Sequence, residues 1–171
     1  KMSQSQYDND GSITEEIQLA DSGYGQGQVL ANPLHLAVMY TAFSNSGSMI
    51  TPYLIYKDDP SAEVWIDQAI SKEHSSLLTE DLKAVVNNPA GSGYAAHRTD
   101  MELAGKTGTA ELKSEQGTTG QEIGWFSVFT TDPSASKPVL LTSMVESVED
   151  KGGSTYVVKK DAAVLDSYFG S

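Results

Sequence analysis

The sequence predicts a mixed α+β fold in which helices flank a central antiparallel sheet. Three strand-like segments follow one another in the last third of the chain, at residues 103–112, 124–130 and 138–148. The connections between them have the length of hairpin loops, which favours antiparallel pairing. Helical patterns precede these strands and another follows them, so helices can cover the sheet.

Bulk composition excludes several classes of function. The chain has 171 residues, 39% of them hydrophobic and 20% charged, which is typical of one globular domain. A net charge of −12 argues against nucleic acid or an anionic membrane surface as a partner. Cysteine is absent, which excludes disulfides and thiol nucleophiles, and the three histidines show no metal-binding spacing. No cofactor or metal is expected.

The first residues, 1–16, are polar, and we interpret them as a flexible tail or the stub of a loop. A short apolar run at 17–20 leads into residues 21–28, where glycines alternate with other residues at Gly23, Gly25 and Gly27. Such spacing indicates a backbone that turns sharply or approaches another group closely. It matches neither glycine motif of nucleotide-binding loops.

Two helices are expected before the strands. Asn32-Pro33 predicts the start of the first, with Asn as N-cap and Pro in the first turn, and Gly47 its end. Its apolar residues predict a helix buried on most sides. Segments 50–56 and 63–66 are expected to form a small peripheral hairpin.

Ser71 predicts the cap of the second helix, which is expected to run to Asn87. Five apolar residues are expected on one face of it, namely Leu77, Leu78, Leu82, Val85 and Val86. Residues 90–100 read as a loop of small residues, and 138–148 as a central strand covered on both faces. A last helix is expected at 161–169, with Ala162, Leu165 and Tyr168 or Phe169 toward the sheet.

One polar stretch carries the chemistry: Lys106-Thr107-Gly108-Thr109-Ala110-Glu111. Gly108 has no side chain, so a peptide-like substrate can lie against the strand there. The threonines offer hydroxyl and amide groups, and Lys106 places a positive charge where a carboxylate or a developing oxyanion is favoured. Taken alone, the triplet is more readily explained as a polar segment near a turn.

Three further features accompany this stretch in a fixed order: Asp21-Ser22-Gly23-Tyr24-Gly25-Gln26-Gly27, then Asn32-Pro33, and after it Gly124-Trp125-Phe126. Together they resemble the C-terminal part of a class B penicillin-binding protein, most of all the low-affinity kind associated with methicillin resistance. The resemblance implies the penicillin-binding protein and serine β-lactamase fold, with Lys-Thr-Gly on the edge strand of the cleft. Residues 17–171 would then be the C-terminal part of one transpeptidase domain.

The resemblance also implies roles for individual residues. Lys106 and Thr109 would be catalytic, the first in proton traffic around a serine and the second through an oxyanion-hole N–H. Substrate would bind as an added strand along residues 106–111, with Thr107, Gly108 and Thr109 in contact with it. Gln26, Tyr24 and Glu111 would line the same cleft.

Two motifs of the family, Ser-x-x-Lys and Ser-x-Asn, are not found in their proper place. Ser134-Ala135-Ser136-Lys137 matches the first only as text, because Pro133 and Pro138 disfavour the helix that a nucleophile needs. Tyr7-Asp8-Asn9 matches the Tyr-x-Asn variant of the second motif. It lies in the polar first segment, however, too close in sequence to Gly25-Gln26-Gly27 to be that motif. We therefore expect a C-terminal fragment that lacks the nucleophile and is inactive alone.

The implied function is a serine D,D-transpeptidase that cross-links peptidoglycan stem peptides and is acylated by β-lactams. Alternatives are a β-lactam sensor, a serine β-lactamase, and a scaffold without chemistry. The implied partners are stem peptides, β-lactams, the upstream part of the same protein and other proteins of cell-wall synthesis. The implied location is the outer face of the bacterial cytoplasmic membrane, with an N-terminal anchor outside this chain.

Overall fold

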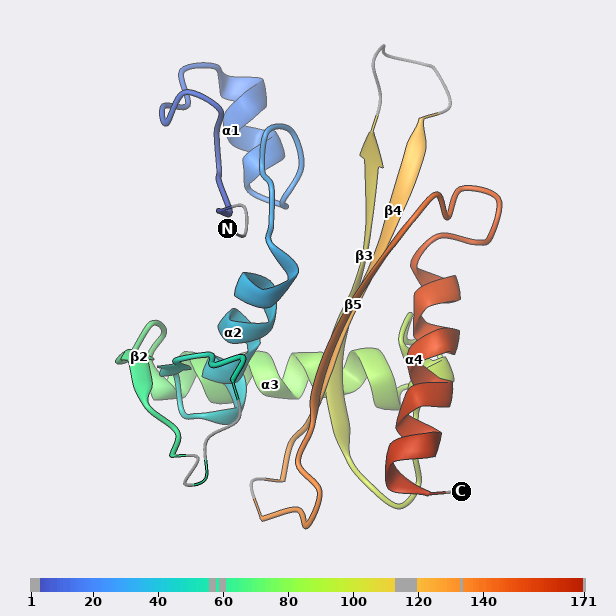
Figure 1. Cartoon of the computed structure of the whole chain (residues 1–171). Coiled ribbons are helices and arrows are strands. Elements are labelled where there is room, and N and C mark those ends of the chain that lie inside the picture. Colours follow the sequence, from blue (N-terminus) through green and yellow to red (C-terminus); the bar gives the residue numbers. More distant parts are fainter. Residues whose placement is uncertain (1–3, 56–57, 59–60, 113–119, 133, 171) are drawn as a thin grey trace.

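The computed structural model describes residues 4–55, 58, 61–112, 120–132 and 134–170. A three-stranded sheet stands at the centre, with helix α4 on one side and α2 on the other, while α3 crosses near one end of the sheet (Figure 1). The helices are α1 (Glu16–Ser22), α2 (Pro33–Ser44), α3 (Lys72–Asn87), the short 3-10 helix η1 (Tyr94–Ala96) and α4 (Ser154–Phe169). The strands are β1 (Met49–Ile50), β2 (Val64–Ile66), β3 (Leu103–Leu112), β4 (Gln121–Thr130) and β5 (Leu140–Glu146).

The main sheet has the order β3-β4-β5, and both pairings are antiparallel, as expected. β3 has the predicted bounds and is an edge of the described sheet. β4 begins at Gln121 instead of Gly124, because Gln121 pairs with Leu112 near the end of the hairpin. The prediction that β5 is central is wrong within the described sheet, where β5 is the second edge.

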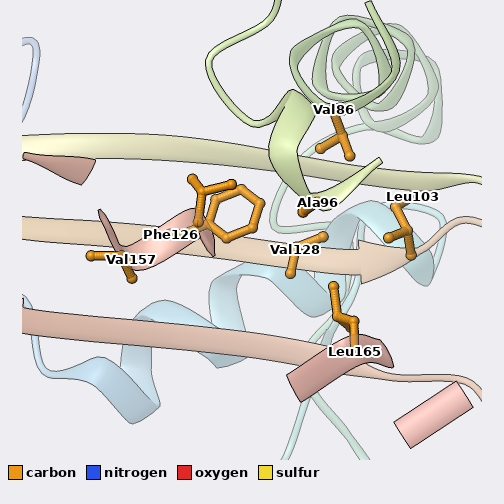
Figure 2. Packing of buried hydrophobic residues seen from close by; sticks show 8 residues of the cluster. Val86, Ala96, Leu103, Phe126, Val128, Val157 and Leu165 are labelled. Atoms are coloured by element: carbon orange, nitrogen blue, oxygen red, sulfur yellow. The ribbon is translucent and has the colours of Figure 1, made fainter. Parts of the chain in front are cut away.

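The main core lies between α4 and one face of the sheet (Figure 2). Phe126 and Val128 of β4 are fully buried there against Val157 and Leu165 of α4. α4 starts at Ser154, well before the expected Asp161. The run Thr155-Tyr156-Val157-Val158 has modest helix propensity, and burial of its two valines, both 0% exposed, outweighs that preference.

α2 covers part of the other face of the sheet. The cap is confirmed, since Asn32 Oδ1 accepts a hydrogen bond of 2.9 Å from the N–H of Leu34. Phe43 stacks on Phe129 of β4, with ring centroids 6.2 Å apart. The expectation of burial on most sides is wrong for this chain, because Val38 and Ala42 are its buried residues while Met39 is 48% exposed.

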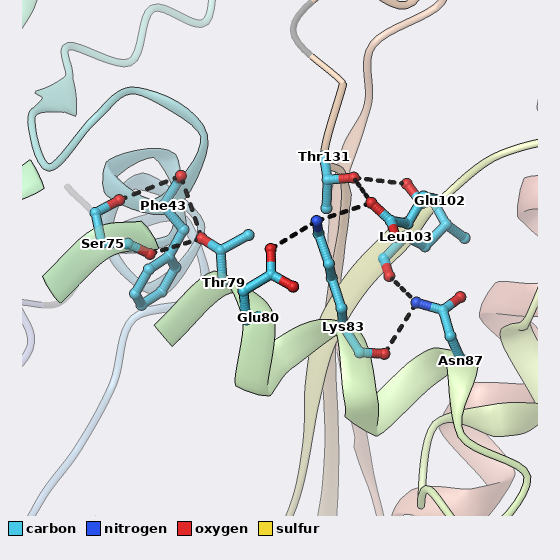
Figure 3. A network of polar contacts seen from close by, with 9 residues as sticks. All are labelled: Phe43, Ser75, Thr79, Glu80, Lys83, Asn87, Glu102, Leu103 and Thr131. Carbon is cyan, nitrogen blue, oxygen red and sulfur yellow. Dashed lines mark hydrogen bonds and ion pairs between the residues drawn. The ribbon is translucent and has the colours of Figure 1, made fainter. Parts of the chain in front are cut away.

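α3 begins at the predicted cap, where Ser71 Oγ accepts from the N–H of His74. Its inward face was assigned wrongly in part, since Leu77 and Leu78 are 61% and 41% exposed. Polar side chains instead connect this helix to its neighbours (Figure 3). The hydroxyl of Ser75 donates to Ala42 O at 3.0 Å, and Asn87 Nδ2 donates to Leu103 O at 2.8 Å.

The smaller elements surround this frame. β1 and β2 pair antiparallel, which confirms the hairpin, although β1 is shorter than its predicted segment. Gly47, with φ of +99°, turns the chain from α2 into β1, and a Cβ there would lie 2.0 Å from Ile70 O. Helix α1 was not predicted, and the loop 90–100 contains η1.

The segment before α1 makes contacts in the part that the structure describes. Gln6 and Leu30 form an isolated antiparallel bridge, with reciprocal N–H to O bonds of 2.9 Å. Asp8 is 6% exposed, and its carboxylate accepts hydrogen bonds from the N–H groups of Asp10 and Ser12. Within the described ranges no helix is long and apolar enough to cross a bilayer.

Candidate active site

The outer edge of β3 carries the candidate site. Three of its carbonyl oxygens accept hydrogen bonds from side chains: Leu103 O from Asn87 Nδ2 at 2.8 Å, Thr107 O from Lys106 Nζ at 2.7 Å, and Thr109 O from Gln26 Nε2 at 3.4 Å. All three belong to alternate positions of the strand. In an antiparallel strand the N–H and C=O of one residue point the same way. Thr107 and Thr109 therefore direct both backbone groups to the free edge.

Lys106 lies between these positions and points to the other side of the pleat. Its register partner on β4 is Ser127, which, like Lys106, lies on the sheet face opposite the α4 core. The lysine side chain is exposed, and its ammonium donates to the carbonyl of its neighbour Thr107. A cation thus stands beside the outward-facing backbone groups of Thr107 and Thr109.

The hydroxyls of the two threonines lie on the α4 side of the sheet. Thr107 is 8% exposed, and its Oγ1 is hydrogen-bonded to Ser92 Oγ at 2.7 Å. Thr109 Oγ1 accepts from the N–H of Ser154, the first residue of α4, at 3.2 Å. The structure therefore places Lys106 and the threonine hydroxyls on opposite faces of β3, and what they share is the edge of the strand.

Gly108 is not required by packing within this chain. A Cβ added there would meet only Trp125 Cβ, at 3.6 Å, which is an ordinary contact. At Gly105, on the same strand, a Cβ would lie 2.5 Å from Ser127 O. The open space at Gly108 lies beside Lys106 and fits the expectation that a substrate approaches the backbone there.

The turn that contains Gly25-Gln26-Gly27 closes over the far end of β3. Gly25 and Gly27 have φ of +79° and +68°, so the turn uses the left-handed region that favours glycine. The conformation brings the Gln26 amide to Thr109 O. Between the turn and the strand lies a groove of about 470 Å³, lined by Asp21, Tyr24, Gln26, Gly27, Thr109 and Glu111.

Tyr24 and Asp21 form one rim of this groove. The Tyr24 hydroxyl donates to Asp21 Oδ1 at 2.9 Å, and this hydrogen bond, together with the carboxylate charge, raises the pKa of Tyr24. Tyr24 is 70% exposed, so solvent or a ligand can reach its hydroxyl oxygen as an acceptor while Asp21 holds the hydroxyl proton. Asp21 was not among the residues expected at the cleft.

Ser92 was also missed. The loop that holds it packs tightly against α3, because a Cβ at Gly91 would lie 2.2 Å from Val85 O. In the sequence, a serine between two glycines indicates a close backbone approach but does not identify the neighbour. The backbone approaches Val85 of α3, and the Ser92 hydroxyl reaches Thr107 of β3.

The text match at Ser134 is confirmed as a turn. The N–H and the hydroxyl of Ser134 both donate to Asp132 Oδ1, at 2.8 and 2.7 Å, and the segment is not helical. Among the residues that the structure describes, no group of three or more His, Cys, Asp or Glu side chains can hold a metal ion.

A second cavity, of about 450 Å³, lies far along the chain from the Lys-Thr-Gly stretch. It is lined by Gln4, Ser5, Asn32, Leu34, His35, Val38, Pro52 and Trp65. His35 is its one titratable lining residue, and it is held by Ser5 Oγ at 2.8 Å and by the Trp65 ring. Because it offers neither a cation nor free backbone of a strand edge, we place the candidate chemistry at β3.

Comparisons with known proteins identify relatives of this chain. Residues 2–165 match the transpeptidase family described as the penicillin binding protein transpeptidase domain. Penicillin-binding protein 3 of Bacillus subtilis (strain 168) is 44% identical over 149 residues, which are 86% of this chain and 22% of that protein. The peptidoglycan D,D-transpeptidase FtsI homolog of Mesostigma viride is 28% identical over 119 residues, 59% of this chain and 20% of that protein.

The fold is also found in solved structures. The TP domain of Burkholderia pseudomallei penicillin-binding protein 3 superposes with a TM-score of 0.70 at 23% identity, over 90% of this chain and 46% of that one. This match confirms the expected fold class, an antiparallel sheet flanked by helices. The chain spans about a fifth of the length of the curated relatives, at 22% and 20%.

Proposed function

Because the chain belongs to the penicillin-binding protein transpeptidase-domain family, we propose that it forms one wall of the active site of a serine peptidoglycan D,D-transpeptidase. The nucleophilic serine would be supplied by a part of the same protein upstream of residue 1. The observation that carries this proposal is the edge of β3, where Thr107 and Thr109 direct their backbone groups outward beside Lys106.

A stem peptide would bind along this edge as an additional strand. Its backbone would pair with the outward N–H and C=O groups of Thr107 and Thr109, and Gly108 would leave room for its approach. Lys106 and Gln26 occupy two of those carbonyls in the free chain, so both side chains would give way to the peptide. The groove lined by Tyr24 and Glu111 would receive the next part of the ligand.

In the proposed reaction the upstream serine attacks the carbonyl of the penultimate D-Ala. The carbonyl oxygen becomes an oxyanion, and the N–H of Thr109 is one of two donors that stabilise it. As the C–N bond breaks, the terminal D-Ala leaves with the serine proton, and Lys106 assists that transfer. The amine of an acceptor stem peptide then attacks the acyl-enzyme, forms the new amide and returns a proton to the serine.

The threonine hydroxyls would hold the terminal carboxylate of the donor peptide. Thr109 Oγ1 accepts from Ser154, which leaves its own proton available to donate. The hydroxyls of Thr107 and Ser92 share one hydrogen bond, so a rotation of Ser92 can free the Thr107 proton. Both donations require the carboxylate to reach around the strand edge toward the α4 side.

The proposal extends to inhibitors and to cellular context. β-Lactams resemble D-Ala-D-Ala, and they would acylate the same serine and remain bound. Partners would include stem peptides and cell-wall synthesis proteins, at the outer face of the cytoplasmic membrane. The resemblance to the low-affinity, methicillin-resistance kind predicts slow acylation by penicillin in the complete protein.

The central experiment labels the complete protein with a fluorescent penicillin and maps the adduct by mass spectrometry. A stable adduct on a serine upstream of residue 1 is expected. An adduct on Ser134 or Ser136 would contradict the assignment of this chain as a wall without a nucleophile. Rapid turnover of the label would point to a β-lactamase. Acylation without any cross-linking activity would point to a sensor, and the absence of any adduct would point to a scaffold.

Lys106→Ala in the complete protein tests the proposed role of the cation. Acylation should slow by roughly 100-fold or more, the range typical of a lost group in proton transfer. The melting temperature should not change, because the side chain is exposed. Lys159→Ala, an exposed lysine of α4, is the matched control and should leave both properties unaltered. Acylation at the wild-type rate in Lys106→Ala would refute the role.

A further inference from the structure

A buried carboxylate in the core is hydrogen-bonded through only one of its two oxygens, within the described residues. Asp161 lies in the middle of α4 and is 3% exposed. Its Oδ1 accepts a hydrogen bond of 2.8 Å from Ser143 Oγ. Its Oδ2 is buried and has no hydrogen-bond partner among the residues that the structure describes. The transpeptidase chemistry proposed above makes no use of this group.

Leaving a carboxylate oxygen alone in a core is costly. The helical neighbours that face the sheet with Asp161 are Val157, Val158 and Leu165, each at most 1% exposed, so the surroundings are apolar. Burial raises the pKa of Asp161, while the Ser143 hydrogen bond lowers it by a smaller amount. Buried charges in proteins are normally paired or bound to metal, and buried polar atoms normally have partners. A residue outside the described chain is therefore expected to satisfy Oδ2.

The position of Asp161 indicates where that residue comes from. Within the described residues, the side chain of Asp161 is hydrogen-bonded to Ser143 of β5, which is an edge strand of the described sheet. The solved transpeptidase domain is matched by this chain over 46% of its length, so more than half of such a domain lies in other residues. An added strand along the free edge of β5 would bring side chains to the α4 face next to Ser143.

We propose that Asp161 forms a buried ion pair with a lysine or arginine of the upstream segment of the same protein that pairs with the free edge of β5. The second carboxylate oxygen would accept the hydrogen bond that the described residues do not supply. The pair would join the two parts of the domain across the sheet edge farthest from Lys106. This inference concerns the assembly of the domain and is independent of the reaction proposed above.

The test compares melting temperatures of the complete protein and two variants. Asp161→Asn keeps the shape and the acceptor for Ser143 but removes the charge, and Asp161→Leu removes both. Breaking a buried pair leaves a lone cation, so both variants should melt about 5 °C or more below the wild type. Asp81→Asn, an exposed carboxylate in α3, is the matched control and should change the melting temperature little. Failure of both Asp161 variants to fold, while Asp81→Asn folds, counts as the same loss of stability, and the suppressor screen then decides whether a buried cation is its cause.

A suppressor screen then identifies the partner. Upstream lysines and arginines are replaced one at a time by Met in the Asp161→Leu background. Removing the buried cation should restore the melting temperature, or folding, at one position only. If Asp161→Asn and Asp161→Leu are as stable as the wild type or more so, Asp161 is unpaired and the proposal is wrong. If stability is lost and no such replacement restores it, neutral donors satisfy Oδ2 and the proposed ion pair is wrong.

Discussion

At the scale of single residues, two glycines of β3 differ in what they are needed for: Gly105 is required by packing, whereas Gly108 leaves room for a ligand. Gly105 faces backbone, because a Cβ there would lie 2.5 Å from Ser127 O and 3.3 Å from the Phe126 ring. Gly108 faces open space apart from Trp125 Cβ at 3.6 Å. Substitution at the first position should therefore affect folding, and substitution at the second should affect whatever binds along the strand edge.

We expect Gly108→Ala to slow acylation of the complete protein by penicillin at least about 10-fold, through a clash with the ligand, while the melting temperature changes by less than about 2 °C. Gly105→Ala, the matched control, should lose roughly 1–3 kcal/mol of stability by overpacking. Stopped-flow acylation and thermal unfolding measure the two effects. A Gly108→Ala protein that is acylated at the normal rate would remove the argument that ligand lies against this position.

At the scale of elements, a side-chain amide of α3 hydrogen-bonds the beginning of β3. Asn87 Nδ2 donates to Lys83 O at 2.9 Å and to Leu103 O at 2.8 Å (Figure 3). Asn87 Oδ1 contacts His97 Nδ1 at 3.1 Å. Leu103, the first residue of β3, is fully buried. The amide thus fixes the beginning of the strand that carries the candidate site.

Asn87→Ala should destabilise the complete protein by about 1–3 kcal/mol, because it leaves the carbonyl of Leu103 without its donor. Chemical denaturation measures the loss. Lys83→Met is the control: it removes the ion pairs of 2.8 Å with Glu80 and 2.9 Å with Glu102, which lie near the surface and should contribute at most about 1 kcal/mol. Equal losses in the two variants would show that the amide has no special role.

Local signals explain which elements could be predicted. α2 and α3 have capping residues whose geometry is set within one turn, and the hairpin-length connections between the three strands favoured antiparallel pairing of neighbours. The start of α4 and the exposure of Leu77 and Leu78 depend on which neighbours are present, and periodicity carries no such information. In the site, Lys106 and Gln26 followed from a motif, whereas Ser92 and Asp21 take part through contacts between distant segments.

At the scale of the whole molecule, the described part of the chain exposes a strand edge and an apolar groove of the kind that is usually buried in a folded protein. β5 has an unpaired edge, and Met144 on it is 38% exposed. Met144 also lines a largely apolar groove of about 590 Å³ with Leu30, Ala31, Pro33 and Leu34, among others. Open strand edges and apolar grooves of this kind favour association with other chains.

The 171-residue chain produced alone should therefore self-associate at concentrations of roughly tens of micromolar. Met144→Lys should reduce that association, since a charge on an edge strand opposes pairing. Val164→Lys, on the exposed side of α4 where Val164 is 51% exposed, is the matched control and should have little effect. Sedimentation velocity distinguishes the outcomes, and a monodisperse monomer of the unmodified chain would contradict the expectation.

The opposite edge of the sheet has a different property. Asn87, Lys106 and Gln26 each donate to one outward carbonyl of β3, so this edge is shielded from strand addition by the chain's own side chains. At the carbonyls of Thr107 and Thr109 a bound peptide then replaces the hydrogen bonds of Lys106 and Gln26, whereas at the N–H groups of these threonines it adds hydrogen bonds. The net enthalpy of the exchange at the carbonyls is small, so affinity comes from the N–H groups, the fit at Gly108 and the charge of Lys106. Side chains that cover the edge of β3 in this way disfavour pairing with unrelated strands, but a ligand that fits the edge can displace them.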